Sequence, residues 1–186
     1  LKNDIIVKKR ERECKMKKRW LLVLVFTCLL FVPRLVFAVD FDILSYKGDL
    51  NIHADNTAVF KETITYHFKD DFNGQLIGLG NAGKMPKGFE IDDDPTVLVS
   101  KNGQIVQDVL SYTKEEEDGY KVTIFNPGNA GDTVRVTVTW QLKNLLFLYQ
   151  DIAELNWQPL TDSSESIEKF EFHVMGDNGA EKLFFH

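Results

Sequence analysis

From Phe41 onward, apolar and polar residues alternate along the chain, so successive side chains are expected on opposite faces of β-strands. The clearest run extends from Ala58 to Phe68, and turn-forming residues at 54–57 precede it. The apolar positions between Ile43 and Ile52 lie before that turn, which predicts an antiparallel hairpin. One face of its second strand carries Ala58, Phe60, Glu62, Ile64, Tyr66 and Phe68.

A second hairpin is predicted where two apolar segments, Val97–Val99 and Ile105–Val106, flank a short polar sequence. That sequence contains Asn102-Gly103, and an Asn-Gly pair readily adopts the positive φ angles of a two-residue turn. The turn type therefore predicts two antiparallel strands that pair closely on either side of it.

Two further strands are predicted after an acidic run at 115–118. The first, Tyr120–Phe125, ends at the Asn-Pro-Gly sequence of 126–128, and the second occupies the alternating residues 134–140. We expect these two strands to be antiparallel neighbours. Residues 144–155 break the alternation and suit either a helical turn or a bulged strand.

Alternation resumes at Ile167–Val174, and turn-forming residues at 177–179 precede a last apolar segment at 183–185. In all, about six to nine short strands are separated by turns, and no amphipathic segment of helix length interrupts them. This pattern predicts one all-β domain over 39–186, an antiparallel β-sandwich of immunoglobulin-like or Greek-key type preceded by a signal-peptide helix.

Residues 71–95 follow no strand pattern and contain five glycines and two prolines, which predicts a long surface loop. Loops of this length in a compact domain usually carry function, so the segment is the candidate interaction surface. Its glycines at 78, 80 and 83 fit a G-x-G-x-x-G spacing, but no predicted helix follows to bind a pyrophosphate. The candidate contact residues are Phe72, Asn73, Gly78, Asn81, Lys84, Met85 and Lys87.

Residues 16–38 have a basic start, an apolar run from Trp20 to Val32 and a cleavage sequence, the order that defines a secretory signal peptide. Signal peptidase is expected to read Val36 and Ala38. An uncleaved membrane anchor is disfavoured because the run is shorter than the roughly 20 apolar residues of a spanning helix. Residues 1–15 precede the first methionine and are interpreted as an upstream, non-structural extension.

Charge and cysteine are distributed unevenly between the leader and the mature part. The net charge is −6, but residues 1–38 hold 10 of the 22 Lys/Arg and 3 of the 28 Asp/Glu, so the remainder carries −13. A field of that sign disfavours nucleic-acid binding. Both cysteines, Cys14 and Cys28, precede residue 39, which excludes a disulfide or a thiol nucleophile in the mature part. An exported domain without disulfides fits a Gram-positive bacterial surface protein better than an animal extracellular module.

No segment carries a catalytic or cofactor signature, so we expect no enzyme activity and no cofactor or metal. Acidic runs at 92–94 and 115–118 offer oxygen ligands for Ca²⁺ but lack the spacing of a calcium loop. Trp140, Trp157 and Tyr149 offer a sugar-stacking platform, although burial of Trp140 in the core is the favoured interpretation. The alternatives that stay open are a cell-wall carbohydrate-binding or glycan-processing protein and a calcium-stabilised surface module.

Four segments of the mature part are distinctive: Val39–Ile43, Gly48–Ile52, the strand at 59–68, and Asp151–Trp157. Together with the leader, they resemble the predicted membrane protein family catalogued as domain of unknown function 2207, over most of the mature part. The resemblance implies an extracellular N-terminal β domain followed by transmembrane helices, and it supplies no catalytic residues. Because the chain ends before any such helix, we expect the domain to be truncated at its C-terminal end.

These observations predict a non-enzymatic interaction or sensing domain of a bacterial surface or membrane protein. Its expected location is extracytoplasmic, either secreted or attached to the membrane at the cell surface. The expected partner is an extracellular protein or a cell-wall ligand, and the family layout implies membrane attachment through C-terminal helices. Nucleic acid is not an expected partner, since the mature part is strongly acidic.

Overall fold

The chain is all-β over the residues that the structure describes, with strands in several sheets and no helix. The predicted fold class is confirmed at that level, whereas the immunoglobulin-like or Greek-key type stays a prediction. Within the same residues, no helix is long and apolar enough to span a membrane. The computed structural model describes residues 39–80, 85–116, 119–158, 160 and 165–177, so the predicted leader lies outside them.

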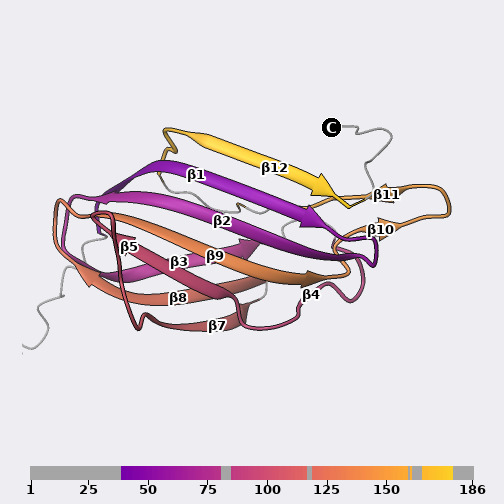
Figure 1. The fold of residues 1–186 in the computed structure, drawn as a ribbon, viewed down its shortest axis with the longest axis horizontal. Coiled ribbons are helices and arrows are strands. Elements are labelled where there is room, and N and C mark those ends of the chain that lie inside the picture. Colours follow the sequence, from indigo (N-terminus) through magenta and orange to yellow (C-terminus); the bar gives the residue numbers. More distant parts are fainter. Residues whose placement is uncertain (1–38, 81–84, 117–118, 159, 161–164, 178–186) are drawn as a thin grey trace, which may run out of the picture. The chain divides into compact units, whose positions relative to one another are not determined.

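The larger sheet has seven strands. They are β1 (Phe41–Ile52), β2 (Thr57–Phe68), β4 (Glu90–Ile91), β5 (Thr96–Lys101), β6 (Gln104–Ile105), β9 (Thr133–Lys143) and β12 (Phe170–Gly176). Their order is β12-β1-β2-β9-β5-β6, and β4 also pairs with β9 (Figure 1). All pairs are antiparallel except β1 and β12, which run parallel although more than a hundred residues separate them.

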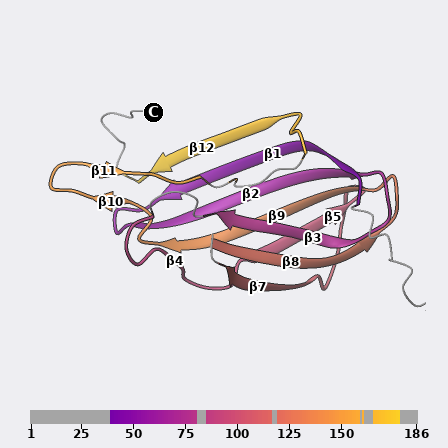
Figure 2. The same ribbon diagram turned by 180° about the vertical axis from the view of Figure 1, so that it is seen from behind.

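The smaller sheet consists of β3 (Phe72–Gly80), β8 (Gly119–Gly128) and β7 (Leu110–Glu116), in that order. The two opposite views show it as a second layer facing the larger sheet (Figures 1 and 2). A short hairpin of β10 (Phe147–Leu148) and β11 (Ala153–Glu154) extends beyond both sheets. The segment at 144–155, which was predicted to be either a helical turn or a bulged strand, therefore contains a two-stranded hairpin.

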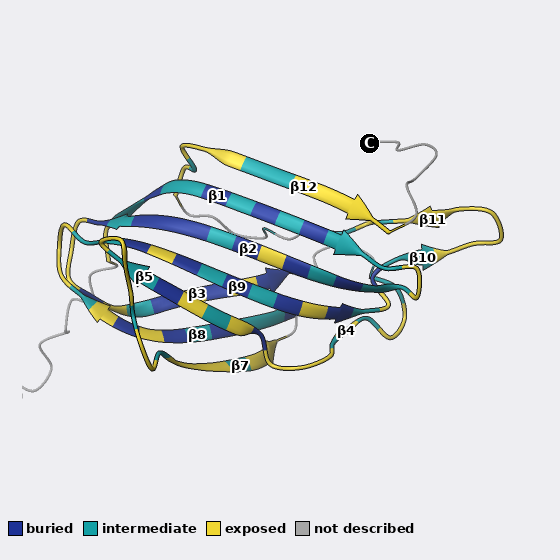
Figure 3. Cartoon of the chain, viewed as in Figure 1, coloured by how far each residue is buried: buried dark blue, intermediate teal, exposed yellow. Residues whose placement is uncertain are grey.

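The core lies between the two sheets, and burial alternates along the central strands (Figure 3). On β9, every second residue from Val134 to Leu142 is at most 1% exposed. The smaller sheet contributes Ile77 and Leu79 from β3 and Val122 and Ile124 from β8 to the same cluster. Because both sheets bury their apolar faces in one core, neither apolar face is exposed to water.

Both predicted hairpins are confirmed. β1 and β2 pair over nearly their full length, with one register irregularity near Ile43. β5 and β6 are joined through Asn102 (φ 52°) and Gly103 (φ 82°), which are the left-handed conformations that a tight hairpin turn requires.

The predicted loop over 71–95 is wrong for residues 72–80, which form β3 and pair with β8. The pairing register shifts between Phe72 and Gly74, and this irregularity interrupts the alternation in the sequence. A Cβ atom at Gly74 would overlap the carbonyl oxygen of Ile124, so glycine is required there by the close approach of two backbones. Three of the five glycines that indicated a loop, at 74, 78 and 80, therefore lie in a strand.

The expectation that the strands after residue 118 are antiparallel neighbours is also wrong. β8 pairs with β3 and β7, whereas β9 pairs with β2, β4 and β5, so the turn at 129–132 connects two sheets. Within that turn Gly131 has φ 90°, and its N–H donates to the Phe68 carbonyl of the larger sheet at 2.8 Å. Alternation defines the buried face of a strand but not the strand that lies beside it.

Candidate functional site

A glutamate interrupts the apolar inner face of β2. The alternation of the strand places Glu62 between Phe60 and Ile64 on the core side, where it is 1% exposed. An acidic side chain is almost never buried to this extent without partners. Its position in the middle of the larger sheet brings it within reach of both neighbouring strands.

Two donors hold the carboxyl group of Glu62. The indole Nε1–H of Trp140, from β9, donates to Oε1 at 2.8 Å, and the hydroxyl of Tyr46, from β1, donates to Oε2 at 3.3 Å. Burial raises the pKa of Glu62 to about 7, because loss of hydration outweighs the stabilisation of the charged form by the two hydrogen bonds. Burial, reinforced by the nearby carboxyl, also raises the pKa of Tyr46 far above its ordinary value, so Tyr46 stays a donor.

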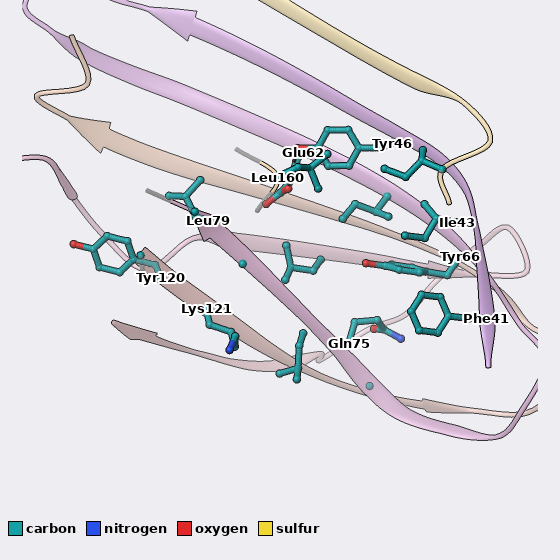
Figure 4. A pocket seen from close by; sticks show the side chains of 18 of the residues that line it. Phe41, Ile43, Tyr46, Glu62, Tyr66, Gln75, Leu79, Tyr120, Lys121 and Leu160 are labelled. Atoms are coloured by element: carbon teal, nitrogen blue, oxygen red, sulfur yellow. Dashed lines mark hydrogen bonds between the residues drawn. The ribbon is translucent and has the colours of Figure 1, made fainter. Parts of the chain in front are cut away.

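An open cavity of about 750 Å³ lies beside this group, between the two sheets (Figure 4). β1 and β2 form one wall and β3 forms the other, with Phe41, Ile43 and Tyr66 opposite Ile77 and Leu79. The volume is within the range of sites that bind small molecules or side chains of a partner.

One polar side chain in this cavity lacks a partner. Gln75, on the inner face of β3, is 5% exposed, and neither its Oε1 nor its Nε2 forms a hydrogen bond within the described part of the chain. Figure 4 places it in the cavity close to Phe41 and Tyr66. A buried amide without partners costs roughly 1–3 kcal/mol for each group, so Gln75 is poised to accept from and donate to a bound molecule.

The charges at the end of the cavity compensate one another. Lys121 Nζ lies 2.6 Å from Glu116 Oε2, and this hydrogen bond lowers the pKa of the Glu116 carboxyl. Lys121 is therefore not a free cation that would attract an anionic ligand. The described residues also contain no group of three or more His, Cys, Asp and Glu side chains placed to hold a metal ion.

Among the residues predicted for the interaction surface, the described ones lie in different environments. Gly78 lines the cavity, but Phe72 is buried and stacks on Phe68 with ring centroids 3.7 Å apart. Met85 is half-buried against the core, and Asn73 and Lys87 are exposed. Outside the described residues lie Asn81, Lys84, Val36 and Ala38.

Two polar residues of the cavity, Glu62 and Gln75, were not predicted as site residues from the sequence, for different reasons. Glu62 stands in the apolar row of β2, so a charged residue at a buried position was a visible signal. Gln75 had no signal, because the segment around it was predicted to be a loop. The core interpretation of Trp140 is confirmed by its complete burial, whereas Tyr149 is 56% exposed, so the two cannot share a sugar platform.

The fold and the cavity define an all-β domain with an internal site between its sheets and no recognisable catalytic constellation in the described residues. The family of predicted membrane proteins known as the DUF2207 N-terminal domain matches residues 42–186, and the chain belongs to this family. The resemblance seen in the sequence is thereby confirmed. No curated protein matches the chain.

Two solved structures have a remote likeness to the chain. An M1 zinc metallopeptidase from Deinococcus radiodurans is 15% identical, with 54% of this chain and 20% of that chain covered and a TM-score of 0.32. Leukotriene A4 hydrolase from Saccharomyces cerevisiae is 14% identical, with 54% and 15% covered and a TM-score of 0.33. The chain thus spans a fifth or less of these proteins, and likenesses this low carry no argument about its activity.

Proposed function

We propose that this domain is a non-enzymatic interaction or sensing module of a membrane protein, and that it binds a ligand between its sheets. In this proposal the domain is an immunoglobulin-like or Greek-key sandwich that works outside the cytoplasmic membrane. The observation that carries the proposal is the buried, unpartnered amide of Gln75 in a cavity of about 750 Å³. Family membership and the signal-like leader support the location.

Binding is favoured over catalysis by the chemistry of the lining. Both carboxyl oxygens of Glu62 already accept hydrogen bonds from Trp140 and Tyr46. The described residues that line the cavity include no Ser, Thr, Cys or His, so the usual nucleophile and base pairs are not assembled there. The partner, whether an extracellular protein or a cell-wall component, would be held by apolar contact and by the amide of Gln75.

The neutral dye Nile red tests whether the cavity binds an apolar molecule. We expect saturable binding to the full chain and at least tenfold weaker binding to Ile77→Trp, because the larger side chain occupies the cavity. The matched control is Leu98→Trp, on the exposed face of β5, where Leu98 is 62% exposed. Circular dichroism establishes that both variants are folded, and equal binding by the parent and both variants would contradict the proposal.

The proposed location can be tested by labelling intact cells with a membrane-impermeant maleimide. Cys14→Ser and Cys28→Ser remove both native thiols, and Asn73→Cys then adds one at an exposed position of β3. We expect this thiol to react in intact cells, whereas Val122→Cys, at a fully buried position, should react only after denaturation. Labelling of Asn73→Cys only after lysis would place the domain in the cytoplasm.

A further inference from the structure

The backbone of β3 itself forms part of the cavity wall. All seven residues from Gly74 to Gly80 line the cavity. They include Leu76, whose side chain points away from the core and is 65% exposed. Because Gly74, Gly78 and Gly80 have no side chain and still line the cavity, main-chain atoms form part of its wall, and the cavity runs along the backbone of this edge strand. At about 3.3 Å per residue, this edge offers about 20 Å of main chain.

That edge has no strand beside it among the described residues. β3 pairs with β8 on one side only. Among the described residues, the side chain of Trp157 also binds the backbone of β3, because its Nε1–H donates to the Gly80 carbonyl oxygen at 2.8 Å. An unpaired edge presents a row of N–H and C=O groups that can template an added strand.

The lining of the cavity also determines which side chains an added strand can place there. Alternate side chains of an added strand point between the sheets. There they meet aromatic and aliphatic groups such as Phe41, Tyr66 and Leu79, together with the unpartnered amide of Gln75. A carboxylate in the cavity would share this space with Glu62, and Lys121, the cation among the described lining residues, is already paired with Glu116. The charge of −13 beyond residue 38 further favours basic residues at the ends of the segment.

We propose that an extended segment of a partner polypeptide adds as a strand to the free edge of β3, with alternate apolar side chains in the cavity and an uncharged amide side chain opposite Gln75. The inference rests on the proposed function of the cavity as a ligand site, and it identifies the ligand as a peptide bound by strand addition.

The probe is a nine-residue peptide in which Val alternates with Thr, with Gln at the centre and Lys at both ends. An added strand pairs through every second residue only, so N-methylation of one alternating set of amides should lower affinity at least tenfold, and N-methylation of the other set should have little effect. Isothermal titration calorimetry on the full, unmodified chain measures both. Equal affinities for the two methylated peptides would overturn strand addition, and this readout does not depend on a variant folding.

Gln75→Leu tests recognition of the central amide. We expect about tenfold weaker binding of the peptide with central Gln, and no loss for a peptide with Val in its place, since about one buried hydrogen-bonding group is removed. Asn73→Ala, on the same strand but outside the cavity lining, should bind both peptides as the parent does. Equal losses for both peptides would overturn the assignment of Gln75.

The outcomes separate this inference from the function on which it rests. If Nile red binds but the peptide does not, the strand-addition inference fails and the proposed cavity site remains. If neither binds, both fail. If size-exclusion chromatography shows a dimer of the chain that the peptide does not dissociate, a second copy occupies the edge, and the proposed partner is wrong.

Discussion

Glu62 combines a carboxyl group with an apolar environment, and this combination makes the stability of the domain depend on pH. Its pKa is about 7 in the folded state, against an ordinary value of 4.5. Between these values the folded state binds more protons than the unfolded state does. The contribution of Glu62 is therefore fully present below about pH 4.5 and is lost as pH rises through 7, by a total of about 3 kcal/mol.

Glu62→Gln should remove this dependence. The amide keeps an oxygen to accept from Trp140, and its NH₂ can donate to the hydroxyl of Tyr46, so the core geometry is preserved. As pH rises from 5 to 8, we expect the free energy of unfolding of the parent to fall by up to about 3 kcal/mol relative to that of the variant. Urea unfolding at the two pH values measures the difference. Parallel stability profiles of the parent and the variant would contradict the raised pKa.

Gly48 is a second residue whose role comes from its neighbours. A Cβ atom there would lie 2.5 Å from Cδ2 of Phe172 and 3.2 Å from Cε2 of Phe60. We expect Gly48→Ala to lower the free energy of unfolding by about 1–3 kcal/mol, because the ring of Phe172 on β12 must move away from β1. The control is Gly176→Ala, on the same pair of strands. A Cβ atom at Gly176 would have one neighbouring atom, 4.0 Å away, so this substitution should change stability little. Chemical denaturation compares the two.

At the scale of elements, the turn between β5 and β6 ties the larger sheet together. Asn102 has φ 52°, its Nδ2–H donates to Asp132 Oδ1 at 2.7 Å, and its Oδ1 accepts from the N–H of Thr133 at 2.9 Å. The side chain therefore links the turn to the start of β9. This contact explains why an asparagine, and not only a residue that tolerates positive φ, occupies the position.

Asn102→Ala should lower the free energy of unfolding by about 1–2 kcal/mol, since it combines backbone strain with the loss of two hydrogen bonds. Asn102→Gly removes the hydrogen bonds but keeps the left-handed conformation accessible, so we expect about half that loss. Comparison of the urea midpoints of the two variants separates the effect of backbone strain from the loss of the hydrogen bonds. If both variants match the parent, the link to β9 contributes nothing.

At the scale of the molecule, one core joins the two sheets. Trp140 is fully buried, and the cluster around it contains residues of both sheets, such as Val122 and Val136. Loss of one sheet would expose the apolar face of the other, so the sheets are expected to unfold together. The cavity lies within this shared interior, and its walls depend on both sheets being in place.

In a Trp20→Phe background, the fluorescence of Trp140 and Trp157 reports the core, and far-UV circular dichroism reports all strands. We expect the two urea transitions to coincide, because the core is common to both sheets. The background substitution removes the one tryptophan outside the described domain, so no separate leader signal remains. A fluorescence transition that precedes the circular dichroism transition would show that the sheets unfold separately.

The sequence by itself determined the local features: the all-β class, the β1–β2 and β5–β6 hairpins, and the burial of Trp140. These depend on alternation and on the φ preference of Asn-Gly, which act over a few neighbouring residues. Glu62 was visible as an acid in an apolar row, but its partners were not. The family was also evident from short segments of sequence.

Only the tertiary structure decided which strands lie side by side and which groups share a space. β8 and β9 both alternate, yet they belong to different sheets, and β12 joins β1 from far along the chain. The cavity lies where Gln75 on β3 and Glu62 and Tyr66 on β2, far apart in the sequence, line one space between the two sheets. Alternation places a side chain on a face, but the pairing of distant strands depends on the summed packing of both sheets, which no local pattern encodes.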